Sequence, residues 1–372
     1  MPGFPERPVL LFWEMTRACP LSCAHCRASA IPQRLPGELT TEEGRTLIDR
    51  LLDFGRPPPT LVLTGGDPLE RPDLFDLIDH ARGRGLHVAV SPAVSERLDA
   101  RTFARFREAG VSALSISLDG GRAAVHDRVH DRVRGVPGIF DRSLEVLATA
   151  LREEMRVQVN STVMAGNAAE FARLFDLVRS RGVRTWEVFF LIRTGRGSDL
   201  SELAPSEAED VGHFLYEASR RGVLVRPVEA PFVRRILRQR QADDAYEGGP
   251  LYRSLRGELE ERLGSGVGAS SLSPKGTLDG DGILFVAYDG TVYPGGFLPE
   301  PLGNVRRDDP VDLYRRSELL VRIRDRALNG ACGRCPYRFD CGGSRARAFA
   351  HSHDALASDP ACPLTAAPAV AA

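Results

Sequence analysis

The sequence predicts an α/β fold, namely a partial (β/α)6 barrel like an incomplete TIM barrel, followed by a smaller C-terminal domain. Strand-like and helical stretches alternate, and the second, third and fourth strands start at residues 60, 87 and 113. Four helical stretches end at a glycine directly before a strand, a residue that suits the left-handed position closing a helix: Gly85, Gly110, Gly182 and Gly222. Repeated βα units indicate a parallel sheet, and six are too few for a closed eight-stranded barrel.

The apolar runs define the expected elements in order. We expect strands at Val9–Glu14, Thr60–Leu63, His87–Val90, Ala113–Leu118, Val157–Val163 and Thr185–Ile192. We expect helices at Thr41–Leu52, Pro72–Arg82, Ala100–Glu108, Phe140–Leu151, Ala168–Arg181, Pro205–Arg221 and Phe232–Ala245. The segment Asp119–Pro137 is rich in Arg, Asp and Gly and is predicted to be an extended loop.

The C-terminal third has a different pattern. Asp289-Gly290 separates two strand-like runs, Ile283–Tyr288 and Thr291–Tyr293, which predicts a hairpin with a two-residue turn. We therefore divide the chain into a barrel at 1–200, a helical bridge and linker at 201–275, a cysteine-containing domain at 276–365 and a disordered tail at 366–372.

The composition excludes several classes of protein. The 372 residues carry a formal net charge of −1, which argues against a nucleic-acid partner. There is no apolar stretch of the ~20 residues that a membrane helix needs, and the N-terminus does not resemble a secretory signal. We expect a cytoplasmic protein without a membrane partner. Lys275 is the single lysine, so all other basic residues are arginine. Because arginine is so abundant in this chain, its presence at a position does not by itself indicate a binding residue.

The seven cysteines form two groups at opposite ends of the chain. The first group, Cys19, Cys23 and Cys26, has the spacing C-x3-C-x2-C and directly follows the first strand. Three thiolates on one tight loop can hold three corners of a cubic iron–sulfur cluster and leave one iron open. The alternative is a zinc site completed by His25 or by a distant residue.

This loop resembles the signature of the radical S-adenosylmethionine (radical SAM) superfamily, in which an aromatic residue usually precedes the third cysteine; here it is His25. A second signature of that superfamily, a Gly-Gly-acidic turn after the second strand, is matched by Gly65, Gly66 and Asp67. The resemblance implies a [4Fe-4S] cluster whose open iron chelates S-adenosylmethionine. One electron would then cleave it to methionine and a 5′-deoxyadenosyl radical, which abstracts hydrogen from substrate.

The resemblance also implies further cofactor contacts. Ser117 and Asp119 end the fourth strand, where family members often place Ser-x-Asp-Gly near the cofactor; a polar loop entry is the alternative. Asn160 is a candidate for the ribose and Ile192 for the adenine. His126, in the expected loop, is predicted to be a solvated surface residue, as is His130.

The second group supplies four thiolates, a complete ligand set for one four-iron cluster or one zinc ion: Cys332, Cys335, Cys341 and Cys362. The region resembles the SPASM extension of many radical SAM maturases, which commonly holds two auxiliary clusters. Gly295 and Arg345 stand where two further cysteines are often found. We therefore predict one auxiliary [4Fe-4S] cluster. Arg345 and Arg347 either pair with substrate carboxylates, or pair with local acids or lie on a solvated helix face.

The local sequence around these cysteines resembles the SPASM branch that contains enzymes of alternative heme and heme d1 formation and maturases of peptides and quinone cofactors. The first hypothesis is a radical SAM oxidoreductase or lyase of heme biosynthesis that modifies a tetrapyrrole side chain, for example by oxidative loss of a propionate carboxyl. The second is a maturase of a ribosomally made peptide, and the third a non-catalytic iron–sulfur or zinc protein. The enzyme hypotheses require an external one-electron reductant such as flavodoxin or ferredoxin.

Overall fold

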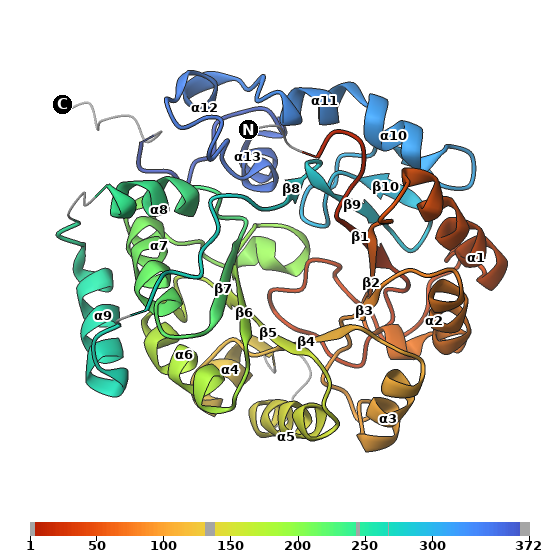
Figure 1. Ribbon diagram of the computed structural model, residues 1–372, viewed down its shortest axis with the longest axis horizontal. Helices are drawn as coiled ribbons and strands as arrows, with labels where there is room; N and C mark the ends of the chain where they lie inside the picture. Colours follow the sequence, from red (N-terminus) through yellow and green to blue (C-terminus); the bar gives the residue numbers. More distant parts are fainter. Residues whose placement is uncertain (1–3, 131–137, 243–245, 267, 365–372) are drawn as a thin grey trace.

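The fold is organised by one continuous, strongly curved sheet. The computed structural model describes residues 4–130, 138–242, 246–266 and 268–364. The strands follow the order β11-β10-β9-β1-β2-β3-β4-β5-β6-β7, and β8 pairs with β9 at the side (Figure 1). Their bounds are β1 Leu10–Glu14, β2 Thr60–Thr64, β3 Val88–Val90, β4 Ala113–Ser117, β5 Val157–Val163, β6 Thr185–Phe190, β7 Leu224–Val228, β8 Leu278–Asp279, β9 Gly282–Val286, β10 Thr291–Tyr293 and β11 Gly303–Asn304.

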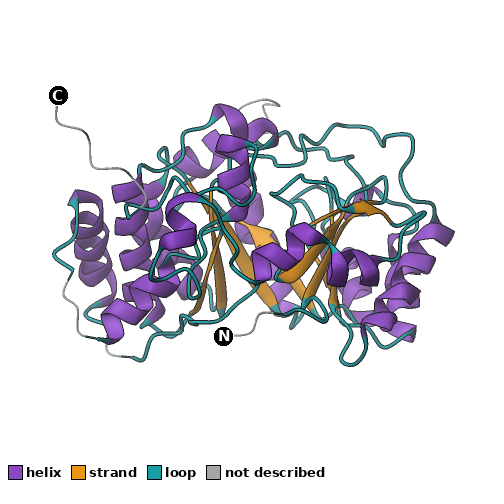
Figure 2. Cartoon of the chain, turned by 90° about the horizontal axis from the view of Figure 1, so that it is seen from above, coloured by secondary structure: helices purple, strands orange, loops and turns teal. Residues whose placement is uncertain are grey.

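Helices cover the outside of the arc formed by β1 to β7 and lie to either side of the strands in Figure 2. The helices of the barrel are α1 Thr41–Arg50, α2 Leu74–Gly83, α3 Ala100–Glu108, α4 Ala123–His130, α5 Ile139–Arg152, α6 Phe171–Ser180 and α7 Pro205–Ser219. The helices that follow are α8 Val233–Gln241, α9 Pro250–Leu263, α10 Pro310–Arg316, α11 Glu318–Arg324, α12 Gly330–Arg334 and α13 Arg345–Ser352.

The six predicted strands are confirmed as a parallel series from β1 to β6, each paired with its sequence neighbour. A seventh strand, β7, continues the series beside β6. The predicted hairpin forms as β9 and β10, but its turn has three residues rather than two, because Ala287 N donates to Thr291 O at 2.8 Å and leaves residues 288–290 between them. On its other edge β9 pairs in parallel with β1. The C-terminal third therefore extends the barrel sheet directly, which brings the hairpin next to the first strand and its cysteine loop.

Alternation along the strands separates an apolar outer face from a more polar inner face. In β5, residues 157, 159, 161 and 163 are buried, whereas Gln158, Asn160 and Thr162 between them are half-buried. On the outer face Trp186 is completely buried, and its ring contacts Phe171 and Phe175 of α6. The polar inner face is available for chemistry because the outer face supplies the core.

The prediction of an extended loop over Asp119–Pro137 is wrong for its first half, where residues 123–130 form α4. The helix forms because it has an apolar face that packs beside α5, where Phe140 N donates to Asp127 Oδ1 at 2.8 Å. His126 is therefore 0% exposed rather than solvated, and its ring contacts Phe140. Residues 131–137 and the predicted tail at 366–372 lie outside the described residues, as does the side chain of His130.

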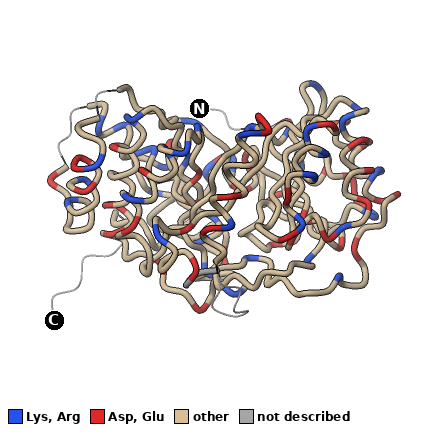
Figure 3. Tube along the Cα trace, turned by 90° about the horizontal axis from the view of Figure 1, so that it is seen from below, with Lys and Arg blue, Asp and Glu red and all other residues tan. Residues whose placement is uncertain are grey.

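Charges of both signs are interleaved along the chain, as Figure 3 shows. Within the described residues we find no helix that combines the length and the apolar character needed to span a bilayer.

We predict that Phe175→Ala lowers the free energy of unfolding by about 3–5 kcal/mol, because it removes a buried ring that packs on Trp186 and leaves a cavity. The midpoint of anaerobic urea denaturation measures this. Val321→Ala, at a side chain that is 38% exposed, is the matched control and should change stability little. Equal midpoints for the two variants would contradict this description of the core.

Candidate active site

The loop after β1 carries the first three cysteines and is fixed by its own backbone. Cys19 N donates to Ile31 O at 2.8 Å, and Ile31 N donates to Arg17 O at 3.0 Å, so the loop returns beside its own start. Two cysteine sulfurs accept backbone N–H groups: Leu21 N lies 3.3 Å from Cys19 Sγ, and Ala30 N lies 3.5 Å from Cys26 Sγ. Such hydrogen bonds stabilise thiolates and tune the potential of clusters that they hold.

The Gly-Gly-Asp turn after β2 packs directly against this loop. Gly66 N donates to Thr16 O, and Asp67 N donates to Ala18 O, both at 2.7 Å. A Cβ atom at Gly66 would lie 2.3 Å from Ala18 O, and one at Gly65 would lie 2.5 Å from Thr16 O. Only glycine lets the two backbones approach this closely, so the sequence pair Gly65-Gly66 sets the position of the cysteine loop.

The carboxyl group of Asp67 is turned into the protein. Its side chain is 0% exposed and accepts hydrogen bonds from Leu69 N, Ala93 N and Ser95 Oγ. These contacts join the turn after β2 to the loop after β3. Burial raises the pKa of Asp67, although the hydrogen bond from Ser95 and those from the two backbone groups oppose that effect. Asp67 thus supports the glycine turn from behind.

The loop after β6 holds the cysteine loop from the other side. Gly195 has φ +55°, and a Cβ atom there would lie 2.2 Å from Arg27 O. Arg196 donates from Nε to Cys23 O at 2.9 Å and from Nη1 to Ala30 O at 2.7 Å, while its backbone N donates to Cys26 O at 3.0 Å. Sequence reasoning placed Ile192 near the adenine but missed Arg196, since one arginine in an arginine-rich chain gives no signal.

Asp119 links the end of β4 to the cysteine loop. It is 1% exposed, and its Oδ2 lies 3.6 Å from His25 Nε2 on that loop. Its Oδ1 accepts the backbone N–H of Thr162, and its own N–H donates to His126 Nδ1 at 3.0 Å. His25 and Asp119, which the sequence analysis singled out separately, are thus brought together, and a histidine that we expected at the surface bonds to the Asp119 backbone.

Ser117 and Asn160 lie on the inner wall of the barrel, on the strands themselves rather than on the loops that follow them. The strand register aligns Ser117 with Asn160, Asn160 with Glu187, and Glu187 with Arg226, so these four residues form one polar row across β4 to β7. Gln158 Nε2 donates to Asn160 Oδ1 at 3.0 Å, and Arg226 Nη1 donates to Glu187 Oε1 at 3.3 Å. Burial raises the pKa of Glu187, an inward-facing acid that sequence reasoning missed.

The second cysteine group lies at the end of the chain between α12, α13 and the segment after α13. Gly343 N donates to Cys341 Sγ at 3.3 Å, and Asp359 N donates to Cys332 Sγ at 3.4 Å. Burial raises the pKa of Cys341 to about 12 and that of Cys362 to about 11, and the neighbouring Cys332 adds to both shifts. Cys332, Cys341 and Cys362 are therefore close neighbours in a buried site.

Buried thiols of raised pKa bind cations by releasing protons, because thiolates are the metal ligands. Burial likewise raises the pKa of Cys19 to about 12. All seven cysteines lie in the described residues and are thiols rather than disulfides. Across the part of the chain that the structure describes, no three His, Cys, Asp or Glu side chains meet as ligands of a single metal ion.

The two C-terminal arginines are buried rather than solvated. Arg347, 2% exposed, pairs with Asp359 at 3.4 Å and Glu202 at 3.6 Å. Arg345, 3% exposed, donates to backbone carbonyls of Gly343, Ala355 and Ala357. Of the predicted alternatives, pairing with local acids is confirmed for Arg347, and a solvated helix face is wrong for both.

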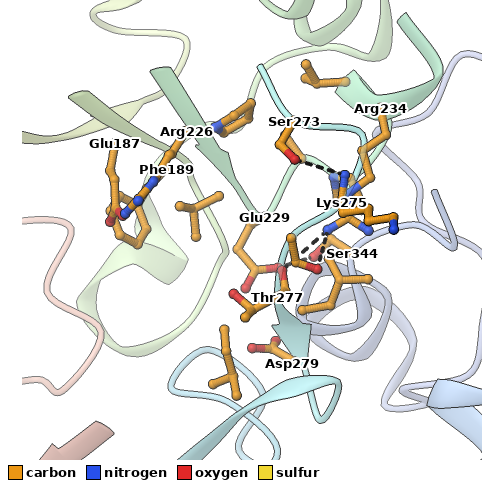
Figure 4. A pocket seen from close by; sticks show the side chains of 18 of the residues that line it. Glu187, Phe189, Arg226, Glu229, Arg234, Ser273, Lys275, Thr277, Asp279 and Ser344 are labelled. Atoms are coloured by element: carbon orange, nitrogen blue, oxygen red, sulfur yellow. Dashed lines mark hydrogen bonds and ion pairs between the residues drawn. The ribbon is translucent and has the colours of Figure 1, made fainter. Parts of the chain in front are cut away.

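Two cavities lie beside the residues of the candidate site. The larger, about 510 Å³, follows the open side of the barrel between β1 and β7 and reaches Ser344 and Arg345 (Figure 4). The smaller, about 290 Å³, lies between the cysteine loop and the hairpin and is lined by Arg17, Arg27 and Tyr288, among others.

A parallel half-barrel that clamps a three-cysteine loop at the carboxyl ends of its strands defines the class of protein. Residues 13–178 match the family model described as the radical SAM superfamily. The chain belongs to this superfamily and is a radical SAM enzyme, and the family implies a [4Fe-4S] cluster and S-adenosylmethionine.

Proteins of similar sequence indicate which members of the superfamily this chain resembles. The chain is 34% identical over 364 residues to the AdoMet-dependent heme synthase of Methanosarcina barkeri, with 95% of this chain and 96% of that protein covered. It is 31% identical to the Fe-coproporphyrin III synthase of the same organism, with 97% and 88% covered. It is also 31% identical to the mycofactocin maturase of Mycobacterium ulcerans, with 96% and 88% covered.

Among solved structures, native anSMEcpe with bound AdoMet has the same fold. The TM-score is 0.68 at 17% identity, with 95% of this chain and 94% of that chain covered.

We predict that Gly66→Ala prevents stable loading of the N-terminal cluster, because the new methyl group would displace the cysteine loop at Ala18 O. Iron content and 5′-deoxyadenosine formation after anaerobic reconstitution measure the effect. Gly83→Ala is the matched control, since a Cβ atom at Gly83 meets no atom within 4 Å. If Gly66→Ala loads iron and forms 5′-deoxyadenosine as Gly83→Ala does, the close approach does not position the loop.

Proposed function

We propose that this radical SAM enzyme acts on a tetrapyrrole and oxidatively removes a propionate carboxyl in heme formation. The observation that carries the proposal is the full-length similarity to an AdoMet-dependent heme synthase. That similarity includes the C-terminal third as well as the barrel, so it covers the region expected to distinguish substrates within the superfamily.

Cys19, Cys23 and Cys26 would hold the radical SAM cluster. The donor set fits, since three thiols lie on one loop, two of them with N–H groups directed at sulfur, and no fourth cysteine lies in that half of the sequence. When bound, the cluster supplies the electron that cleaves S-adenosylmethionine to methionine and a hydrogen-abstracting 5′-deoxyadenosyl radical.

The chain's own residues would orient the cofactor. The peptide groups of Gly65 and Gly66 offer a surface without side chains beside the cysteine loop, which suits a closely approaching amino acid moiety. Asn160 and Ser117 present polar groups from the barrel wall, and Ile192 covers the loop end as an apolar surface. Asp119 would keep His25 in place, since its carboxylate lies beside that ring.

The proposed reaction balances with one electron left over. The propionate carbon next to the ring loses a hydrogen atom, the bond to the carboxylate breaks, carbon dioxide leaves, and a vinyl group forms. One electron per propionate needs an acceptor. We propose that Cys332, Cys335, Cys341 and Cys362 hold one auxiliary [4Fe-4S] cluster that would supply this acceptor, and that an external reductant such as flavodoxin or ferredoxin delivers the first electron.

The second candidate is a maturase acting on a ribosomally made peptide, which the similarity to a mycofactocin maturase supports over nearly the whole chain. The domain limits at 200, 275 and 365 and a cytoplasmic location are part of the same proposal. The non-catalytic alternative is set aside because the chain is a radical SAM enzyme.

We predict that Cys23→Ala and Cys341→Ala separate the two clusters. Each variant should retain about four of about eight iron atoms per chain. Cys23→Ala should form no 5′-deoxyadenosine, whereas Cys341→Ala should still form it but give no decarboxylated porphyrin. Iron analysis and chromatography of nucleoside and porphyrin products measure these outcomes.

Wild-type protein that cleaves S-adenosylmethionine but transfers no hydrogen from coproporphyrin, with or without iron, contradicts the proposed substrate. Iron near four per chain in the wild type contradicts the auxiliary cluster.

A further inference from the structure

The larger cavity reaches Arg345 and Asp279, and Asp279 packs against Gly295; Arg345 and Gly295 are the two positions where the SPASM resemblance would place further cysteines. The cavity lining runs from the β1 and β7 walls to Asp279, Ser344 and Arg345. A Cβ atom at Gly295 would lie 1.7 Å from Asp279 Oδ1, so no side chain fits there. In this chain, an acidic group and an arginine occupy the place of those ligands.

Two carboxyl groups meet at this end of the cavity. Glu229 follows β7 and is held at φ +56°, a conformation that a glutamate rarely adopts and that is concentrated at functional sites. Ser344 Oγ donates to Glu229 Oε2 at 2.6 Å, and Asp279 of β8 lines the same cavity, as Figure 4 shows. Burial, followed by the adjacent Glu229, raises the pKa of Asp279 well above its usual range, and burial also raises that of Glu229.

Adjacent buried carboxyl groups cannot both ionise easily, so protonation of one of them is favoured. Asp279 is 7% exposed, and no N–H or O–H group of the described residues donates to its Oδ2. Asp279 therefore resembles a neutral acid kept available as a hydrogen-bond donor through Oδ2, beside an ionised Glu229.

Arg345 faces the same place from α13 and reduces the pKa rise of Asp279. Its Nε and Nη1 are bonded to backbone carbonyls, whereas its buried Nη2 has no acceptor among the described residues, nor does Arg345 form an ion pair with them.

Lys275 also lines the cavity, and two other arginines near this end have partners of their own. Arg347 pairs with Asp359 and Glu202, and Glu202 also contacts His351 at 2.6 Å. Arg234 of α8 donates to the backbone carbonyl of Gly276 at 3.0 Å. Arg345 Nη2 and Asp279 Oδ2 are thus two buried polar atoms among the described residues that remain for a ligand.

We propose that Arg345, Asp279 and Glu229 form a carboxylate subsite in this cavity, which binds one propionate of the tetrapyrrole and rests on the proposed function. Arg345 Nη2 donates to one carboxylate oxygen, and a proton on Asp279 Oδ2 donates to the same group. The arginine charge balances the single charge of the half-protonated pair, so an anionic ligand is accepted without net repulsion.

Binding of coproporphyrin III to the reconstituted holoenzyme, followed by fluorescence between pH 6 and pH 9, tests the subsite. The porphyrin propionates are ionised throughout this range. Affinity should fall as pH rises, because the acid pair loses its donor proton and becomes doubly negative. The tetramethyl ester of coproporphyrin III, which lacks carboxylates, should bind at least tenfold more weakly at pH 6 and show no such fall.

Two variants distinguish binding from folding. Arg345→Gln should weaken coproporphyrin III binding about tenfold or more, the scale of a lost charged hydrogen bond. Asp279→Asn replaces the Asp279 proton with a permanent amide donor, so it should retain binding within about threefold at pH 7 and lose the pH dependence. Arg262→Gln, at a half-buried ion pair on α9, is the matched control and should behave as the wild type. Each variant is first checked for iron content and for 5′-deoxyadenosine formation without porphyrin.

Wild-type affinity in Arg345→Gln, or an unchanged pH slope in Asp279→Asn, overturns the subsite while leaving the proposed function intact. Binding of Mn²⁺ at this place that strengthens with pH and is lost in Asp279→Asn overturns it in favour of a cation site. If the wild type binds no coproporphyrin III but a precursor peptide instead, the proposed function itself fails.

Discussion

The close approach of three backbone segments is the constraint on which the site depends. The turn after β2 and the loop after β6 both lie in close contact with backbone carbonyl groups of the cysteine loop. At Gly66 and Gly195 the space between the glycine and the nearest carbonyl oxygen is too small for a methyl group. Arg196 joins the same loop through three hydrogen bonds. The loop is thereby held by rigid strands on both sides, as a preorganised catalytic site requires.

The same sheet connects the two ends of the chain. Because β9 pairs with β1, the C-terminal third is built onto the edge of the barrel and closes its open side. The resulting cavity lies between the inner barrel wall and the start of α13, beside the C-terminal cysteine region. Under the proposed function, the C-terminal third would select the substrate and accept the remaining electron, while the barrel supplies the radical chemistry common to the superfamily.

Local sequence patterns were sufficient to predict the barrel strands and the class of protein. Helix-ending glycines and apolar runs predicted the parallel strands, and cysteine spacing with Gly65-Gly66 predicted the class. Sequence alone could not show that Asp67 points inward, that His126 is buried behind Asp119, or that Glu187 and Arg226 align with Asn160, because register and tertiary packing decide these facts. Asp279 and Glu229, fifty residues apart in sequence, give no local sign of their pairing.

The central claim is that the clamped loop supplies only three ligands and keeps one iron position open to the cofactor. Electron–nuclear double resonance on the reduced Cys341→Ala variant, with ¹⁵N in the amino group of S-adenosylmethionine, tests it most directly. We predict a nitrogen coupling that shows the amino group bound to the cluster. A cluster signal that is unchanged by the labelled cofactor and shows no such coupling would contradict the account.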